Sequence, residues 1–87
     1  MSNVDTAAVL DQVREIMAAT FALDESDLPN DVSQQTCRRW TSLQHMTLMV
    51  ALEEQFGVRL SMADMAAMKS LPQIVTTLKT YTEAAAA

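Results

Sequence analysis

The chain is poor in the residues that build hairpins, disulfides and multi-cysteine metal sites. Its 87 residues include one glycine, two prolines, one cysteine and four aromatic side chains. A single cysteine excludes an internal disulfide and any metal site made from several cysteines. Because glycine and proline are scarce and no run alternates apolar with polar residues, helices are favoured over tight β-hairpins. We therefore predict an all-α fold whose core is aliphatic and includes many of the seven methionines.

Basic charge and long apolar runs are also scarce. The chain has six Lys and Arg against eleven Asp and Glu, which gives a net charge of −5. Nucleic acids and anionic membranes attract clustered Lys and Arg, so this charge disfavours both as partners. No apolar run approaches the roughly 18 residues of a membrane span, and no basic-plus-apolar leader opens the sequence. We expect a single domain over residues 1–87 that is monomeric, cytoplasmic and suited to basic surfaces on partner enzymes.

The best-defined element is a helix from about residue 42 to residue 56. Thr41 is a good N-cap, and Gln44 follows at the spacing of a capping box. Gly57 is placed where a left-handed residue ends a helix, and Val58 can make the accompanying hydrophobic contact. The sequence therefore predicts both ends of this helix.

Three other helices and a long loop complete the predicted small four-helix bundle. The first helix covers about residues 3–20 and is followed by a loop to Trp40. A short helix over 65–68 is capped by Ser61, and a longer last helix has Pro72 in its first turn, where a missing N–H does little harm. We expect the end of the chain, from Glu83 onward, to fray. The predicted core side chains are Val9, Val13, Ile16, Met17, Phe21, Leu23, Leu28, Val32, Trp40, Leu48, Met49, Ala51, Leu52, Phe56, Leu71, Ile74, Val75 and Leu78.

Ser42 is the first helical residue if Thr41 is the cap. Its hydroxyl then lies beside unpaired backbone N–H groups, at the positive end of the helix dipole. An anion attached to that oxygen would be stabilised by roughly 0.3–1 kcal/mol.

The helix that begins Ser42-Leu43 and ends Ala-Leu-Glu-Glu-Gln-Phe-Gly-Val at 51–58 resembles the second helix of acyl carrier proteins. The resemblance extends without a gap from about Val13 to Leu78. It implies that Ser42 carries covalent 4′-phosphopantetheine, derived from coenzyme A, and that this helix is the recognition element. The family usually has Asp before the serine. Here the residue is Thr41, which removes a negative charge that modifying and partner enzymes read.

The resemblance implies a carrier protein that is not itself an enzyme. It would hold acyl groups as thioesters in fatty-acid or polyketide-type, specialised metabolism. Its implied partners are a phosphopantetheinyl transferase, an acyl-activating ligase or acyltransferase, and condensing or modifying enzymes. Two alternatives stay open: an aminoacyl or peptidyl carrier, and a helical interaction module that keeps the fold without modification. Thr41 is the main argument for the unmodified module.

A second face of the 42–56 helix is apolar with few charges, which is unusual for a face in solvent. We predict that it docks partners through its apolar side chains, with glutamates as a polar rim. Gln44 and Thr47 stand where the resembling family is often acidic, so partner binding should depend less on salt and more on apolar contact. The predicted docking residues are Thr41, Leu43, Gln44, Met46, Val50, Glu53 and Glu54.

His45 lies three residues after Ser42, on the same helix face. This is the spacing of a Ser–His dyad, but a nucleophile also needs an oriented base and oxyanion donors in a dry cleft, for which so small a chain has little room. We interpret His45 as a solvent-facing residue, with contact to the arm or to a partner as the alternative.

Three residues before the helix remain. Cys37 lacks a histidine in a recognisable catalytic motif, so we predict an unreactive thiol. Arg38 and Arg39 are expected to be a solvated patch, with pairing to the bundle's carboxylates or contact with a partner as alternatives. No metal site is predicted.

Overall fold

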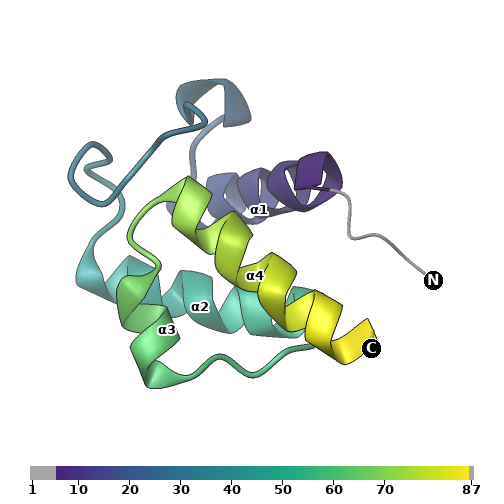
Figure 1. Ribbon diagram of the computed structural model, residues 1–87. Coiled ribbons are helices and arrows are strands. Elements are labelled where there is room, and N and C mark those ends of the chain that lie inside the picture. The colour runs from purple at the N-terminus through teal and green to yellow at the C-terminus, as the bar shows by residue number, and fades with distance from the viewer. Residues whose placement is uncertain (1–5, 87) are drawn as a thin grey trace.

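The computed structural model of the protein describes residues 6–86, and over that range it is entirely helix and loop apart from one isolated β-bridge. Three helices are long and one is short, as predicted (Figure 1). A single 3-10 turn lies within the first loop. The predicted helix start at residues 3–5 and the final residue 87 fall outside the described range. The elements are α1 (Thr6–Phe21), η1 (Glu25–Asp27), α2 (Ser42–Phe56), α3 (Met62–Ala67) and α4 (Leu71–Ala86).

Serines cap the two helices that follow α2. Ser61 Oγ accepts a hydrogen bond from Asp64 N at 3.0 Å at the start of α3. Ser70 Oγ accepts one from Gln73 N at 3.3 Å at the start of α4. The Ser61 cap confirms the sequence prediction, and Ser70 caps α4 in the same way. The helix α4 is drawn to Ala86, and fraying from Glu83 onward stays a prediction.

The end of α1 uses a left-handed residue that is not glycine. Ala22 has φ of 56°, and Leu23 N donates to Ala18 O at 2.9 Å, which closes the turn as in a Schellman motif. Gly57 does the same for α2, with φ of 64° and a hydrogen bond from Val58 N to Glu53 O. The glycine stop was predicted; the alanine stop was not, because alanine seldom adopts this conformation.

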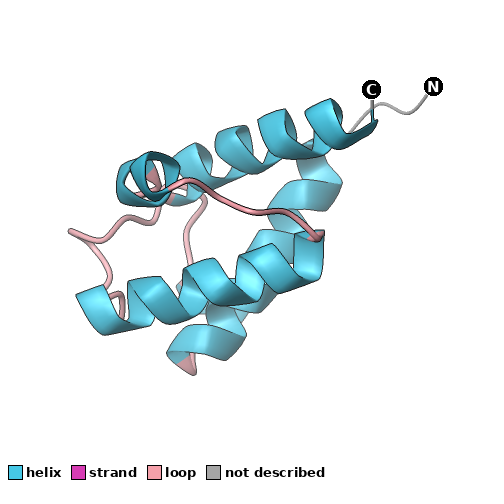
Figure 2. Cartoon of the chain, turned by 90° about the horizontal axis from the view of Figure 1, so that it is seen from below, coloured by secondary structure: helices cyan, strands magenta, loops and turns pink. Residues whose placement is uncertain are grey.

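The core lies where α1 packs against both α2 and α4 (Figure 2). The predicted core is confirmed: Ile16, Leu23, Ala51 and Phe56 are half-buried, and the other predicted core residues are buried. The methionines divide: Met17, Met49 and Met68 are buried, whereas Met46 and Met62 are exposed, so only some of them fill the core. No helix in the described range is long and apolar enough to cross a bilayer.

The long first loop is tied to the bundle by backbone pairing as well as by apolar anchors. Leu71 N donates to Val32 O at 2.8 Å, and Gln34 N donates to Lys69 O at 3.0 Å, so the loop runs beside the start of α4. Arg14 of α1 is half-buried and donates to Glu25 O at 2.5 Å. The path from α1 to α2 is therefore fixed at several points.

Candidate functional site

Ser42 stands at the front of α2, exposed to water. Thr41 has the extended backbone of an N-cap, with φ −82° and ψ 172°, and its Oγ1 accepts a hydrogen bond from Gln44 N at 3.2 Å. Thr41 O accepts the first intrahelical bond, from His45 N at 2.8 Å. Ser42 is thus the first helical residue, as the spacing predicts. The side chain is exposed, so its hydroxyl is open to an incoming modifying enzyme.

Trp40 fixes how the chain enters α2. The side chain is 3% exposed and packs against Phe21 at the end of α1, with ring centroids 5.6 Å apart. Its Nε1 donates to His45 Nδ1 at 2.9 Å. The residue two positions before Ser42 is therefore held by both α1 and the first turn of α2.

His45 corrects the sequence interpretation. We expected a solvent-facing side chain, but it is 9% exposed and is the buried polar residue of the core. Trp40 Nε1 can only donate, so His45 Nδ1 must be the acceptor. His45 Nε2 then carries the proton and donates to Met65 O at 2.8 Å. Both ring nitrogens of His45 are therefore hydrogen-bonded. The imidazole links Trp40, which precedes α2, to Met65 in α3.

This arrangement removes the Ser–His dyad as an explanation of the site. A general base must accept a proton from the nucleophile through a free ring nitrogen. His45 Nδ1 already accepts from Trp40, and Nε2 is a donor to a carbonyl. Ser42 therefore has no base from His45.

The two arginines before Trp40 have different surroundings. Trp40 N donates to Cys37 O at 3.1 Å, so Arg38 and Arg39 occupy the corner of a tight turn. Arg39 Nη1 donates to Phe21 O at 3.1 Å and satisfies a carbonyl at the end of α1. Arg38 is exposed and, among residues 6–86, forms no hydrogen bond or ion pair. Both arginines are exposed, as expected, although Arg39 is held by one hydrogen bond, and Cys37 is a half-buried free thiol.

The predicted docking face is exposed along α2. Leu43 is 77% exposed, Met46 52% and Val50 51%. Glu54 is exposed, whereas Glu53 is half-buried and its Oε2 accepts from Leu60 N at 2.9 Å. Glu53 thus holds the linker that runs back toward the start of α2, as Figure 1 shows.

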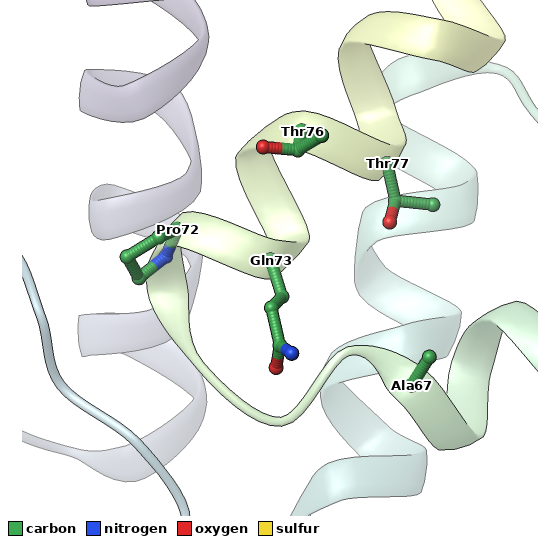
Figure 3. A pocket seen from close by; sticks show the side chains of 5 residues that line it. All are labelled: Ala67, Pro72, Gln73, Thr76 and Thr77. Carbon is green, nitrogen blue, oxygen red and sulfur yellow. The ribbon is translucent and has the colours of Figure 1, made fainter.

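The structure also contains open hollows, and one beside α4 carries no acidic or basic side chain. One lies between the end of α3 and the first turns of α4 and is lined by one alanine, one proline, one amide and two threonines (Figure 3). None of these side chains titrates near neutral pH, so the hollow offers no acid–base pair. No cluster of three potential metal ligands exists within the described residues. The lining residues are Ala67, Pro72, Gln73, Thr76 and Thr77.

Sequence analysis missed the Trp40–His45 pair and the carbonyl of Met65. The only signal was a Trp and a His five residues apart around the cap, and neither helical periodicity nor capping rules assign a partner to such a pair. It also missed the role of Glu53 in holding the linker, because the linker's path is a property of the folded chain.

Comparison with known proteins adds the chemical identity of the site. The profile of the phosphopantetheine attachment site family matches residues 39–78, which include Ser42, the whole of α2 and α3, and half of α4. A comparison with curated proteins found no match. Members of this family carry 4′-phosphopantetheine, covalently attached. An exposed hydroxyl at a fixed helix start fits that group. Over these residues the chain is similar to the phosphopantetheine attachment site family, in keeping with its resemblance to acyl carrier proteins.

Proposed function

We propose that the protein is an acyl carrier protein with 4′-phosphopantetheine attached to Ser42. The observation that carries the proposal is the exposed Ser42 hydroxyl at the capped start of α2, within the residues that match the attachment-site family. When bound, the group supplies a terminal thiol that holds an acyl chain as a thioester. The protein's own residues contribute a rigid platform: Thr41 fixes the helix start, and Trp40 with His45 fixes the approach to it.

The carrier has no catalytic machinery of its own in this proposal. The transferase brings the base and coenzyme A, because His45 cannot serve Ser42. The other partners are an acyl-activating ligase or acyltransferase and condensing or modifying enzymes of fatty-acid or polyketide-type, specialised metabolism. We propose that the protein works as a monomeric single domain in the cytoplasm.

The test is the mass of the intact protein after incubation with coenzyme A and a broad-specificity phosphopantetheinyl transferase. Wild type should gain one phosphopantetheine, and Ser42→Ala should gain none. Ser26→Ala is the matched control, because Ser26 is also an exposed serine and lies in η1, which has no buried residue. It should be modified like wild type. A wild-type protein that stays unmodified would support the unmodified interaction module instead.

The class of cargo is a separate question with a separate measurement. Mass spectrometry of protein loaded in cells distinguishes an acyl chain from an amino acid on the arm. We expect an acyl chain, because the 51–58 run resembles acyl carriers. An aminoacyl adduct would transfer the proposal to the aminoacyl or peptidyl class while leaving Ser42 as the attachment residue.

We further propose that partners dock on the exposed side of α2. Three apolar side chains, Leu43, Met46 and Val50, form its centre, with Thr41 and Gln44 beside the attachment point. Glu54 gives the free polar edge, whereas Glu53 contributes with one carboxylate oxygen already engaged. Because the centre is apolar, affinity for a partner should fall only modestly with added salt. A partner complex that dissociates at moderate salt would contradict this.

A further inference from the structure

The charge of the chain is strongly segregated around the attachment site. Residues 32–52 contain no Asp or Glu and include Arg38 and Arg39, so their net charge is +2 with His45 neutral. The rest of the chain has four basic and eleven acidic residues and carries −7, which together restores the total of −5. The segment that contains Ser42 therefore has the opposite sign to the chain as a whole.

The structure shows which of these positive charges is available to a partner. Both arginines are exposed; Arg39 is positioned by its Nη1 bond to Phe21 O, while Arg38 has no partner among the described residues. Arg38 sits in the turn closed by the Trp40 N to Cys37 O bond. Since Trp40 is anchored to His45 in the first turn of α2, this turn is held in a fixed position beside the start of that helix.

The apolar centre of the same surface begins immediately after Ser42. Leu43, Met46 and Val50 recur at the spacing of one helical face and are each more than half exposed. Thr41 and Gln44 are uncharged, so no carboxylate separates this apolar row from Arg38. We define the Arg38 face as Arg38, Leu43, Met46 and Val50.

We infer that the Arg38 face docks a partner protein whose apolar contact surface is bordered by Asp or Glu side chains. This rests on the docking role proposed above for α2, but not on modification of Ser42. Apolar contact supplies the attraction, and a carboxylate opposite Arg38 supplies orientation and selectivity. The net charge of the whole chain predicts the reverse preference, for a basic partner.

The test uses two designed helical peptides of equal length that share one leucine stripe. In one peptide the stripe is flanked by Glu, and in the other by Lys. Each is titrated into the full chain, and binding is followed by NMR of the methyl groups of Leu43, Met46 and Val50. We expect the Glu-flanked peptide to shift these methyl signals at lower concentration than the Lys-flanked peptide, despite the protein's net charge of −5.

Two matched charge reversals distinguish the effect of the charge at Arg38 from the effect of the net charge of the whole chain. Arg38→Glu should weaken binding of the Glu-flanked peptide by about two- to fivefold, the range typical of one exposed ion pair. Lys79→Glu makes the same charge change. Lys79 Nζ bonds Thr6 Oγ1 at the start of α1, at the far end of the bundle from the start of α2 (Figure 1), so it should leave the preference unchanged. Leu43→Ser should weaken both peptides.

Several outcomes would overturn the inference. It fails if the Lys-flanked peptide binds the three methyl groups as well as or better than the Glu-flanked one. It also fails if Lys79→Glu acts like Arg38→Glu, or if neither peptide shifts the methyl signals. Helix content by circular dichroism verifies that each variant is folded. Because no arm is needed here, failure of this test and failure of the Ser42 mass test can be told apart.

Discussion

The hydrogen bond between Trp40 and His45 gives the sharpest prediction about stability. Trp40→Phe keeps an aromatic ring against Phe21 but removes Nε1, leaving buried His45 Nδ1 without its donor. An unsatisfied buried acceptor costs about 1–3 kcal/mol. The smaller ring adds about 1 kcal/mol for lost packing. The expected loss is about 2–4 kcal/mol, from a total stability of about 4–13 kcal/mol for a chain of this length.

A double-mutant cycle isolates the bond from the packing. His45→Phe leaves Trp40 Nε1 unpaired and removes one donor from Met65 O, which keeps its bond from Met68 N, whereas Trp40→Phe with His45→Phe loses only that one donor to Met65 O. Urea unfolding followed by circular dichroism measures all four free energies. The double variant should be more stable than the sum of the single losses by about 1–2 kcal/mol. Additivity within about 0.5 kcal/mol would refute the reasoning.

The same cycle has a functional readout. Because His45 contributes structure and no base, folded His45→Phe should still gain phosphopantetheine on Ser42 in the intact-mass assay. A variant that keeps the helix content of wild type but is no longer modified would return His45 to a direct role at the attachment site.

Three further changes test the helix ends. Ala22→Gly should raise the free energy of unfolding by about 0.5–1 kcal/mol, since glycine adopts the φ of 56° without strain; a loss in urea unfolding would contradict this. Thr41→Asp should keep the cap and add about 0.3–1 kcal/mol from the helix dipole, measured the same way at low salt, and a destabilised variant would show that the cap is misread. Tyr81→Phe should cost about 1–3 kcal/mol because its hydroxyl accepts from Ser61 N and donates to Asp64 Oδ2; an unchanged melting curve would rule that bridge out as a stabilising contact.

The elements of the fold were predictable where the signals are local. The Thr41 cap and the Gly57 stop each depend on a residue's own conformation and on neighbours within one turn, so both ends of α2 followed from spacing. The apolar periodicity of α1 and α4 likewise identified most of the core. The all-α bundle needed nothing beyond these rules.

Several of the missed features involve pairings between residues far apart in the sequence. Arg39 reaches Phe21 O eighteen residues away, and His45 reaches Met65 O twenty residues away. A polar side chain on an apolar helix face gives no sign of which distant carbonyl it will meet. The burial of His45 could thus be inferred only once α3 was placed beside α2.

Residue 41 has two separable roles at the proposed attachment site: it caps α2, and its charge affects recognition. The fold requires an oxygen acceptor for Gln44 N, and Thr41 provides it as well as Asp would within a few tenths of a kcal/mol. Recognition by modifying and partner enzymes responds to the negative charge of the usual Asp, which Thr41 does not provide. Since residues 32–52 lack any acid, Thr41 is one part of a segment without negative charge and is no isolated loss. In the proposed carrier, this segment keeps the geometry of the attachment helix while its net charge has the opposite sign to that of the whole chain.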